Sequence, residues 1–374
     1  MSQQRDVEQN EHQPEAIDVP RAFLCGGVEQ ERKKLLIATL SNPMCPACRE
    51  NLTPADGDSL RCVGCERIYP IVTGIPDLRL VPDQEDTDRA CYLGERFEEL
   101  RSTELAFDIA SIRSLGDPER IAAREEAIVD SAVAAIEAIE REIKCAIGPE
   151  HRVLEMGCGS AWFAVAVSAF TPNVAAIDSS LLKLVLARKR ISKQSPRGVT
   201  LYCADAQEPV FPSASFDVVA AMDVIEHLPR PDAFIARCWE VLCPGGLLFL
   251  ATPNRYSLSF EPHVRLWGVG FLPRSLARHY VRARRPGAEF RVRSLSAWQL
   301  RRLLEKQGFR PVTVEAPEIP AGLHVLYHGL ERQLIRMYNA SHRCALVRSL
   351  LLAVGPCFRV IARKPENQSC PGGQ

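Results

Sequence analysis

The chain has 374 residues, of which 46% are hydrophobic and 25% are charged, a composition typical of globular proteins with room for two domains. Its 46 basic and 46 acidic residues give a formal net charge of zero, which argues against a whole-molecule attraction to nucleic acid or to an anionic membrane. The first twenty residues contain no apolar signal segment, and no apolar run is long enough to span a bilayer. We therefore expect a cytoplasmic protein whose 14 cysteines bind metal or are simply buried.

The first 42 residues predict a flexible tail with a short helix near Gln30–Leu40. Residues 43–81 then contain two Cys-x2-Cys pairs separated by thirteen residues, with ligands at Cys45, Cys48, Cys62 and Cys65. Each pair can present two thiolates to one tetrahedral ion, and four sulfur ligands favour structural Zn²⁺ with no open position for catalysis. Two disulfides are the alternative, which a reducing compartment disfavours.

The residues after the second cysteine pair add a more specific pattern, Tyr69-Pro70-Ile71 followed by Gly74-Ile75-Pro76. Together with the four cysteines, this pattern resembles the zinc-ribbon family of a small protein that activates several tRNA, rRNA and release-factor methyltransferases. Bacterial members of that family also occur fused to methyltransferase domains. The resemblance implies a β-rich zinc ribbon over 43–81, with a methyltransferase domain in the same chain.

Residues 82–149 are expected to connect this ribbon to a larger domain. A polar connector at Pro82–Asp88 precedes a long helix at Asp117–Ala146, for which Asp117 is a suitable cap and Pro118 a suitable first residue. Apolar residues recur at helical spacing along one face of this helix, at Ile121, Ile128, Ala132, Ile136, Ile139 and Ile143. We expect the helix to cover a sheet.

Residues 150–364 alternate between strands and helices, which predicts an α/β fold with a Rossmann-like, largely parallel sheet of seven strands covered on both faces. The predicted strands are 152–155, 173–177, 199–203, 217–221, 246–251, 311–314 and 358–362. The predicted helices are 161–168, 181–192, 231–242 and 296–307. Two long insertions interrupt the pattern, a lid at about 253–295 and a helical insertion at about 316–356; such loops usually select substrates.

The first strand of this domain runs into a glycine turn, Glu155-Met156-Gly157-Cys158-Gly159, and the second strand ends at Asp178. Glycines allow the backbone to approach a ligand closely, and a carboxylate at the second strand end can hold a ribose diol. The dinucleotide pattern requires a third glycine at position 162, where this chain has Trp162. A nucleoside without phosphates is therefore favoured, S-adenosylmethionine above all, and a nicotinamide-dependent oxidoreductase is disfavoured.

Two further strand ends complete the predicted donor site. A carboxylate at Asp205 can accept a hydrogen bond from the adenine amino group while the Ala206 N–H donates to the ring, and the strand ending near Met222 and Asp223 can form the floor under the methionine part. This ordered set resembles the class I S-adenosylmethionine-dependent methyltransferases, particularly the ubiquinone and menaquinone biosynthesis group. By that resemblance, the residues that contact the donor are Glu155, Gly157, Cys158, Gly159, Asp178, Ser179, Asp205, Ala206, Met222 and Asp223.

His227 is the nearest residue able to act as a general base, which the reaction needs only if the acceptor keeps its proton at neutral pH. The alternative is that Glu226-His227-Leu228 is a sequence motif common throughout the methyltransferase family that this chain resembles, whatever the acceptor, and that His227 is not catalytic. In the lid, His263, Arg265 and Trp267 either bind the acceptor or pack the lid itself.

Ten arginines and a single acid, Glu289, lie between Arg265 and Arg302. This run either forms a solvated face or faces an anionic substrate, RNA or lipid. We expect a methyltransferase acting on a small molecule. An RNA or protein methyltransferase with the ribbon as docking module is the alternative, and a catalytically idle binding protein is a third interpretation. The sequence carries no signal for an oligomeric state.

Overall fold

The computed structural model describes residues 42–55, 58–95, 118–194, 198–288, 290–320, 329–342 and 345–366. The helix predicted near Gln30–Leu40 and the cap predicted at Asp117 lie outside these residues. The small N-terminal sheet and the large sheet belong to the same compact unit of the chain.

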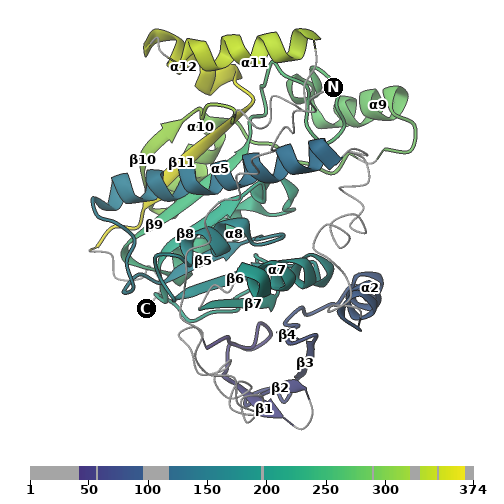
Figure 1. The fold of residues 1–374 in the computed structure, drawn as a ribbon, viewed down its shortest axis with the longest axis vertical. Coiled ribbons are helices and arrows are strands. Elements are labelled where there is room, and N and C mark those ends of the chain that lie inside the picture. The colour runs from purple at the N-terminus through teal and green to yellow at the C-terminus, as the bar shows by residue number, and fades with distance from the viewer. Residues whose placement is uncertain are drawn as a thin grey trace, which may run out of the picture. The chain divides into compact units, whose positions relative to one another are not determined.

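The large sheet has seven strands in the order β10-β11-β9-β8-β5-β6-β7 (Figure 1). Five neighbouring strands from β9 to β7 run parallel, whereas β11 is antiparallel to both β9 and β10. This topology confirms the predicted α/β, Rossmann-like sheet, and each observed strand overlaps a predicted one. Their bounds are β5 Val153–Met156, β6 Val174–Asp178, β7 Val199–Cys203, β8 Phe216–Met222, β9 Leu242–Pro253, β10 Arg310–Glu315 and β11 Cys357–Arg363.

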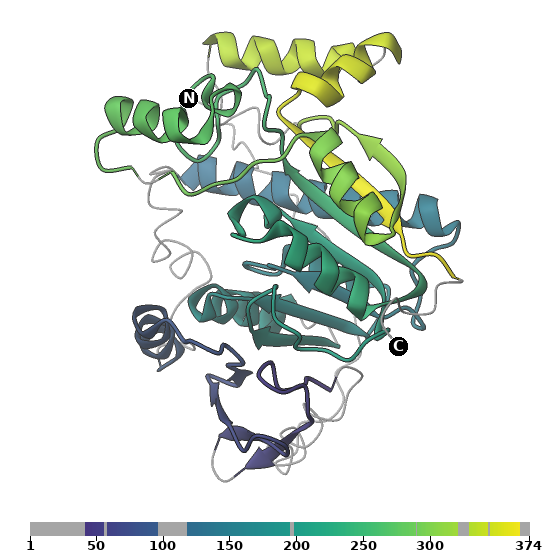
Figure 2. The same ribbon diagram turned by 180° about the vertical axis from the view of Figure 1, so that it is seen from behind.

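Helices cover both faces of this sheet. Figure 1 shows α5 (Pro118–Ile143) and α7 (Leu181–Gln194) on one face, and Figure 2 shows α8 (Pro231–Val241) and α10 (Ala297–Gln307) on the other. Because both faces are covered, the central strands are apolar on both sides, and Leu154, Val218 and Phe249 are almost completely buried. The short helix α6 (Trp162–Val167) follows the glycine turn.

The N-terminal sheet is small and antiparallel, with the order β1-β2-β3-β4. Its strands are β1 Leu52–Ala55, β2 Ser59–Cys62, β3 Ile68–Val72 and β4 Ile75–Pro76, which confirms the predicted β-rich unit. The chain leaving β4 then pairs with the edge strand β7 of the large sheet, because Leu78 N–H donates to Cys203 O at 2.7 Å. A single bridge after β4 therefore ties the small sheet, which remains separate, to the edge of the large one.

The segment predicted as a polar connector contains a helix, α2 (Gln84–Glu95). Asp83 begins it as a cap, since its Oδ1 accepts from Asp86 N–H at 3.1 Å. The prediction of a connector was wrong here because the polar composition of the first turn hid this cap, while Ala90 and Leu93 are buried against the rest of the unit.

Both insertions contain helices. The lid holds a 3-10 turn, η2 (Val269–Phe271), and helix α9 (Arg274–Arg284), with a small core of its own formed by Val264, Val269, Ala277 and Val281. The second insertion holds α11 (Gly329–Ser341) and α12 (Ala345–Val354). Within the described ranges, no helix combines the length and apolar character needed to cross a membrane.

Candidate active site

The predicted donor residues lie together at the carboxyl ends of four adjacent strands, β8, β5, β6 and β7. The glycine turn after β5 is tied to β6, because the N–H groups of Gly157 and Cys158 both donate to Ile177 O at 2.8 Å. On the other side of β6, Ala204 N–H donates to Asp178 O at 3.0 Å, so the end of β7 is also held in place. In an open α/β sheet, this edge is where ligands bind.

The two glycines of the turn have different roles. Gly157 has φ +74°, and a Cβ added to it would lie 2.3 Å from Val224 Cγ2, so the fold itself excludes a side chain there. Gly159 has φ +52°, yet an added Cβ would meet no atom within 4 Å. Gly159 therefore leaves open space in front of the turn, as a bound ligand requires.

Asp178, at the end of β6, is the residue that links the turn to the next helix. Its Oδ2 accepts from Gly159 N–H at 2.8 Å and its Oδ1 accepts from Ser180 N–H at 2.9 Å. The side chain is 7% exposed. A carboxylate fixed in this way sets the conformation of the glycine turn.

Glu155 is buried inside the domain, where it makes a structural hydrogen bond to the backbone of α6. It is 4% exposed, and its Oε2 accepts from Ala164 N–H at 2.9 Å in the first turn of α6. Burial raises the pKa of Glu155 to about 8, with the charge of Asp178 acting in the same direction. Trp162, which replaces the third glycine of the dinucleotide pattern, begins α6 with the Arg190 guanidinium 3.5 Å above its ring.

Asp205 and Ala206 follow β7. Asp205 Oδ1 accepts from Gln207 N–H at 2.9 Å and from Gln207 Nε2 at 3.2 Å, and Ala206 is buried. Met222 ends β8, and Asp223 continues with φ +54° while its N–H donates to Ala251 O at 2.9 Å. The structure thus brings all ten predicted donor residues to one edge of the sheet.

His227 lies in the 3-10 turn η1 (Ile225–His227) after β8 and faces the lid. Its Nε2 is 3.3 Å from His263 Nε2, and His263 Nδ1 is 2.7 Å from Glu261 Oε1. The hydrogen bond to Glu261 raises the pKa of His263, whereas burial and the nearby His263 lower the pKa of His227. Glu261, which the sequence did not single out, completes this three-residue chain because the lid folds back over η1.

Glu226 lies directly beneath the two histidines. Its side chain is fully buried, Oε2 accepts from Thr252 Oγ1 at 3.0 Å, and Oε1 has no hydrogen-bond partner among the residues that the structure describes. Burial, together with the charge of Asp223, raises the pKa of Glu226 to about 7. A carboxylate oxygen of Glu226 and one ring nitrogen each of His227 and His263 all lie within 4.8 Å of one another.

Among the other predicted lid residues, Trp267 donates from Nε1 to Leu258 O at 3.0 Å, which indicates packing within the lid. Arg265 has φ +52°, and its N–H donates to Glu261 O at 2.7 Å in a tight turn. Only His263 of the three approaches the residues at the strand ends.

The structure brings the four ribbon cysteines together, and their Sγ atoms all lie within 4.8 Å of one another. The Sγ atoms of Cys45 and Cys65 are 3.6 Å apart and those of Cys48 and Cys62 are 3.3 Å apart. Bond lengths of about 2.3 Å to a tetrahedral ion place the sulfur atoms about 3.8 Å apart, so a small expansion of the cluster would accommodate one ion. The N–H groups of Gly64 and Cys65 point at Cys62 Sγ at 3.4 Å, as in metal-binding knuckles. The residues therefore fit a zinc ion.

A polar cluster that the sequence did not reveal joins the ribbon to the donor site. Arg79 forms a two-pronged ion pair with Asp77, a further one with Asp86 at 2.9 Å, and donates to Ser179 O at 3.1 Å. Asp86 in turn accepts from Ser180 Oγ at 2.6 Å and from Leu181 N–H at 2.7 Å. A carboxylate from α2 thus caps α7, immediately after the loop that carries Asp178.

Comparison with known proteins agrees with this site. Residues 154–250 match the family model described as "Methyltransferase domain". The match includes the glycine turn, the ends of β6 to β8 and His227, but it covers only part of the chain.

Curated relatives carry the same kind of domain. The chain is 32% identical over 151 residues to a ubiquinone biosynthesis O-methyltransferase of Bradyrhizobium sp., and 32% identical over 157 residues to one of Xanthomonas campestris. The aligned part is 40% of this chain in both cases, and the chain spans only 57% and 61% of those relatives' own lengths.

A solved complex of the Haloferax volcanii Trm112 methyltransferase activator with a methyltransferase is also similar. It is 13% identical, covers 71% of this chain and 98% of that chain, and has a TM-score of 0.45. A likeness at this level does not bear on function.

Proposed function

We propose that this protein is an S-adenosylmethionine-dependent methyltransferase that methylates a hydroxyl group of a small molecule. The observation that carries the proposal is the joint position of Asp178 and Asp205 beside a glycine turn that leaves open space at Gly159. Asp178 and Ser179 would hold the ribose, and Asp205 with Ala206 would hold the adenine. Gly157, Cys158 and Gly159 would line the methionine part, with Met222 and Asp223 as its floor.

S-adenosylmethionine, when bound, supplies a methyl group that is already strongly electrophilic because its sulfur is positively charged. The protein therefore mainly positions the acceptor and excludes water. An unionised hydroxyl acceptor additionally requires a base to take its proton.

His227 is the base in this proposal, and Glu261 and His263 orient it. Glu261 accepts from His263 Nδ1–H, which leaves His263 Nε2 to accept from His227 Nε2–H. His227 Nδ1 then carries the free lone pair and can take the hydroxyl proton. The charge that develops on His227 is shared along the chain toward the Glu261 carboxylate.

A small-molecule acceptor is supported by the zero net charge of the chain and by the ubiquinone biosynthesis activity for which its curated relatives are named. RNA or protein substrates, docked through the ribbon, are the alternative. In the ribbon we propose that Cys45, Cys48, Cys62 and Cys65 bind one structural Zn²⁺.

The direct test is incubation of the full chain with S-adenosylmethionine carrying a labelled methyl group and with fractionated cell extract. We expect label in the small-molecule fraction, and loss of most of it with His227→Asn. His279→Asn, which changes an exposed histidine on α9 away from this chain of residues, serves as the control. Label in RNA or protein alone, or none in any fraction, would refute the proposal.

A further inference from the structure

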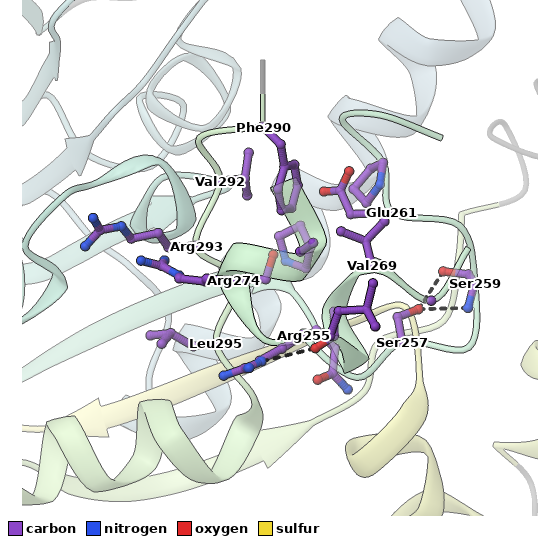
Figure 3. Close-up of a pocket in the computed structure, with 18 of the residues that line it drawn as sticks. Arg255, Ser257, Ser259, Glu261, Val269, Arg274, Phe290, Val292, Arg293 and Leu295 are labelled. Atoms are coloured by element: carbon purple, nitrogen blue, oxygen red, sulfur yellow. Dashed lines mark hydrogen bonds between the residues drawn. The ribbon is translucent and has the colours of Figure 1, made fainter. Parts of the chain in front are cut away.

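The lid encloses a pocket of about 260 Å³, close to the lower end of the range for small-molecule sites (Figure 3). Its walls come from the end of β9, from η2, from the start of α9 and from the segment 290–295. All of these parts belong to the segment from the end of β9 to residue 295, and the fold of the lid brings them together around one space.

Three arginines line this pocket, Arg255, Arg274 and Arg293. Figure 3 shows their guanidinium groups directed toward the same side of it. Arg255 is held by a hydrogen bond from Nε to Gly270 O at 3.2 Å, and Arg293 by one from NH1 to Pro229 O at 2.7 Å. The backbone therefore fixes two of the three cations.

In the part of the chain that the structure describes, none of these three arginines forms an ion pair with a carboxylate. Burial and the charges of Arg293, Arg255 and Arg278 lower the pKa of Arg274, as expected for cations that repel one another. Glu261 also lines the pocket, but its carboxylate is taken up by His263 and by the N–H groups of His263 and Val264. Glu289 lies outside the described residues.

The remaining wall is largely apolar, with Val269, Leu272, Phe290 and Val292 among its residues. Arginines that only formed a solvated, charged surface would not need an apolar wall beside them. A ligand that fits both parts has an anionic group and an apolar body.

The pocket adjoins the proposed base. Glu261 and Pro262 line it directly, next to His263. Arg293 also donates from its N–H to Glu226 O at 2.6 Å, one residue before His227. His227 and His263 do not line the pocket themselves, so an acceptor anchored there by its anionic group would extend out of the pocket toward them.

We propose that Arg255, Arg274 and Arg293 bind an anionic group, a carboxylate or a phosphate, of an acceptor whose body is apolar. This inference rests on the proposed methyltransferase function and specifies the substrate class of that site. Charge-assisted hydrogen bonds from guanidinium to carboxylate or phosphate are strong and geometrically specific, which makes these residues a specificity site.

The test measures binding of four small probes to the full chain saturated with S-adenosylhomocysteine, by ligand-observed nuclear magnetic resonance. The probes are benzoate and phenyl phosphate, and as neutral analogues benzamide and benzyl alcohol. We expect both anions to bind at least about tenfold more tightly than the neutral analogues, and the better of the two anions to identify the group. Equal binding of charged and neutral probes, or binding of none, would overturn the proposal.

Two variants separate the pocket from general positive charge. Arg274→Gln combined with Arg293→Gln should weaken anion binding about tenfold or more, whereas Arg282→Gln, on the same helix but outside the pocket, should leave it unchanged. An equal loss in both variants would show an unspecific effect and contradict the assignment. Arg274→Lys, which keeps the charge and the fold, should retain part of the affinity.

Two further measurements distinguish an anionic small-molecule site from a membrane or RNA surface, and the failure of this inference from the failure of the proposed function. Preferential binding to phosphatidylcholine vesicles containing phosphatidylglycerol, or to RNA, would assign the arginines to a membrane or nucleic-acid surface instead. S-adenosylhomocysteine binding is measured separately by calorimetry. If the donor product binds but the anionic probes do not, this inference fails while the proposed methyltransferase function stands.

Discussion

Individual residues divide the glycine turn into a structural part and a ligand-facing part. Gly157 is required by the fold, since its positive φ and the nearby Val224 leave no room for a side chain. A Cβ added to Gly159 would meet no atom within 4 Å, so we predict that its lack of a side chain makes room for a ligand. The sequence motif treats the two glycines alike, and only the three-dimensional surroundings separate their roles.

Alanine substitutions should show this difference. Gly157→Ala should lower the free energy of unfolding by about 1–3 kcal/mol because of its clash and backbone strain. Gly159→Ala should lower the free energy of unfolding by roughly 1–2 kcal/mol, from backbone strain alone. Its loss of binding free energy for S-adenosylhomocysteine should be larger than this loss of stability. Urea unfolding and calorimetry measure the two quantities, and an identical profile for both variants would contradict the division.

The histidine pair predicts a particular pH dependence. The pair takes up its first proton on His263, whose pKa Glu261 raises, and that proton occupies the hydrogen bond through which His227 is oriented. Because a raised pKa keeps the group protonated up to higher pH, kcat/KM should fall as pH drops through a value above the ordinary histidine pKa of about 6.5.

Glu261→Gln removes the cause of that raised pKa. It should move the acid limb of the pH–rate profile to lower pH and also reduce the plateau. A profile unchanged by this substitution, or an acid limb that already lies below about 6.5 in the natural chain, would show that His263 and Glu261 take no part.

At the scale of elements, α2 and Arg79 connect the ribbon to the loop after β6. Arg79 bonds Asp77 at the end of the ribbon, Asp86 on α2 and Ser179 O in the donor loop. Its side chain is 5% exposed, so this cluster is a buried one. The sequence predicted the ribbon and the strands from local patterns. Arg79 pairs with the nearby Asp77 and Asp86, but its contact with Ser179 O, like that of Asp86 with Ser180 Oγ, depends on tertiary contacts about a hundred residues away along the chain.

Arg79→Met should therefore destabilise the chain by about 3–5 kcal/mol, because it leaves the buried carboxylates of Asp77 and Asp86 without their cation. Affinity for S-adenosylhomocysteine should fall as well, since Ser179 loses its contact. Arg301→Met, which breaks an exposed pair with Glu305, should change stability by less than about 1 kcal/mol. Thermal unfolding of both variants decides this, and equal effects would contradict a buried linking role for Arg79.

For the whole molecule, periodic patterns predicted the sheet and its covering helices, because buried strands need apolar residues on both faces. The grouping of the predicted donor residues at strand ends was predictable too, and their role in binding the donor stays a prediction. Glu261 and Arg255 were not, because their roles depend on how the lid folds back. The helix at Gln84–Glu95 was missed because its polar first turn looked like a linker.

The ribbon makes a prediction about metal content. The full chain should contain about one zinc ion per molecule by elemental analysis, and Cys48→Ser with Cys65→Ser should abolish it. Cys145→Ser, an exposed cysteine outside the cluster, should keep it. Because the ribbon pairs with β7, zinc loss should also lower the melting temperature of the chain. A chain without zinc that melts unchanged would contradict the proposed metal site.

The central claim is that the strand ends around Asp178 bind the methyl donor, and calorimetric titration with S-adenosylhomocysteine tests it most directly. The natural chain should bind one equivalent, Asp178→Asn should weaken binding by about tenfold or more, and Asp232→Asn on α8 should bind like the natural chain. No measurable binding by the natural chain, or equal binding by the Asp178→Asn variant, would contradict the account.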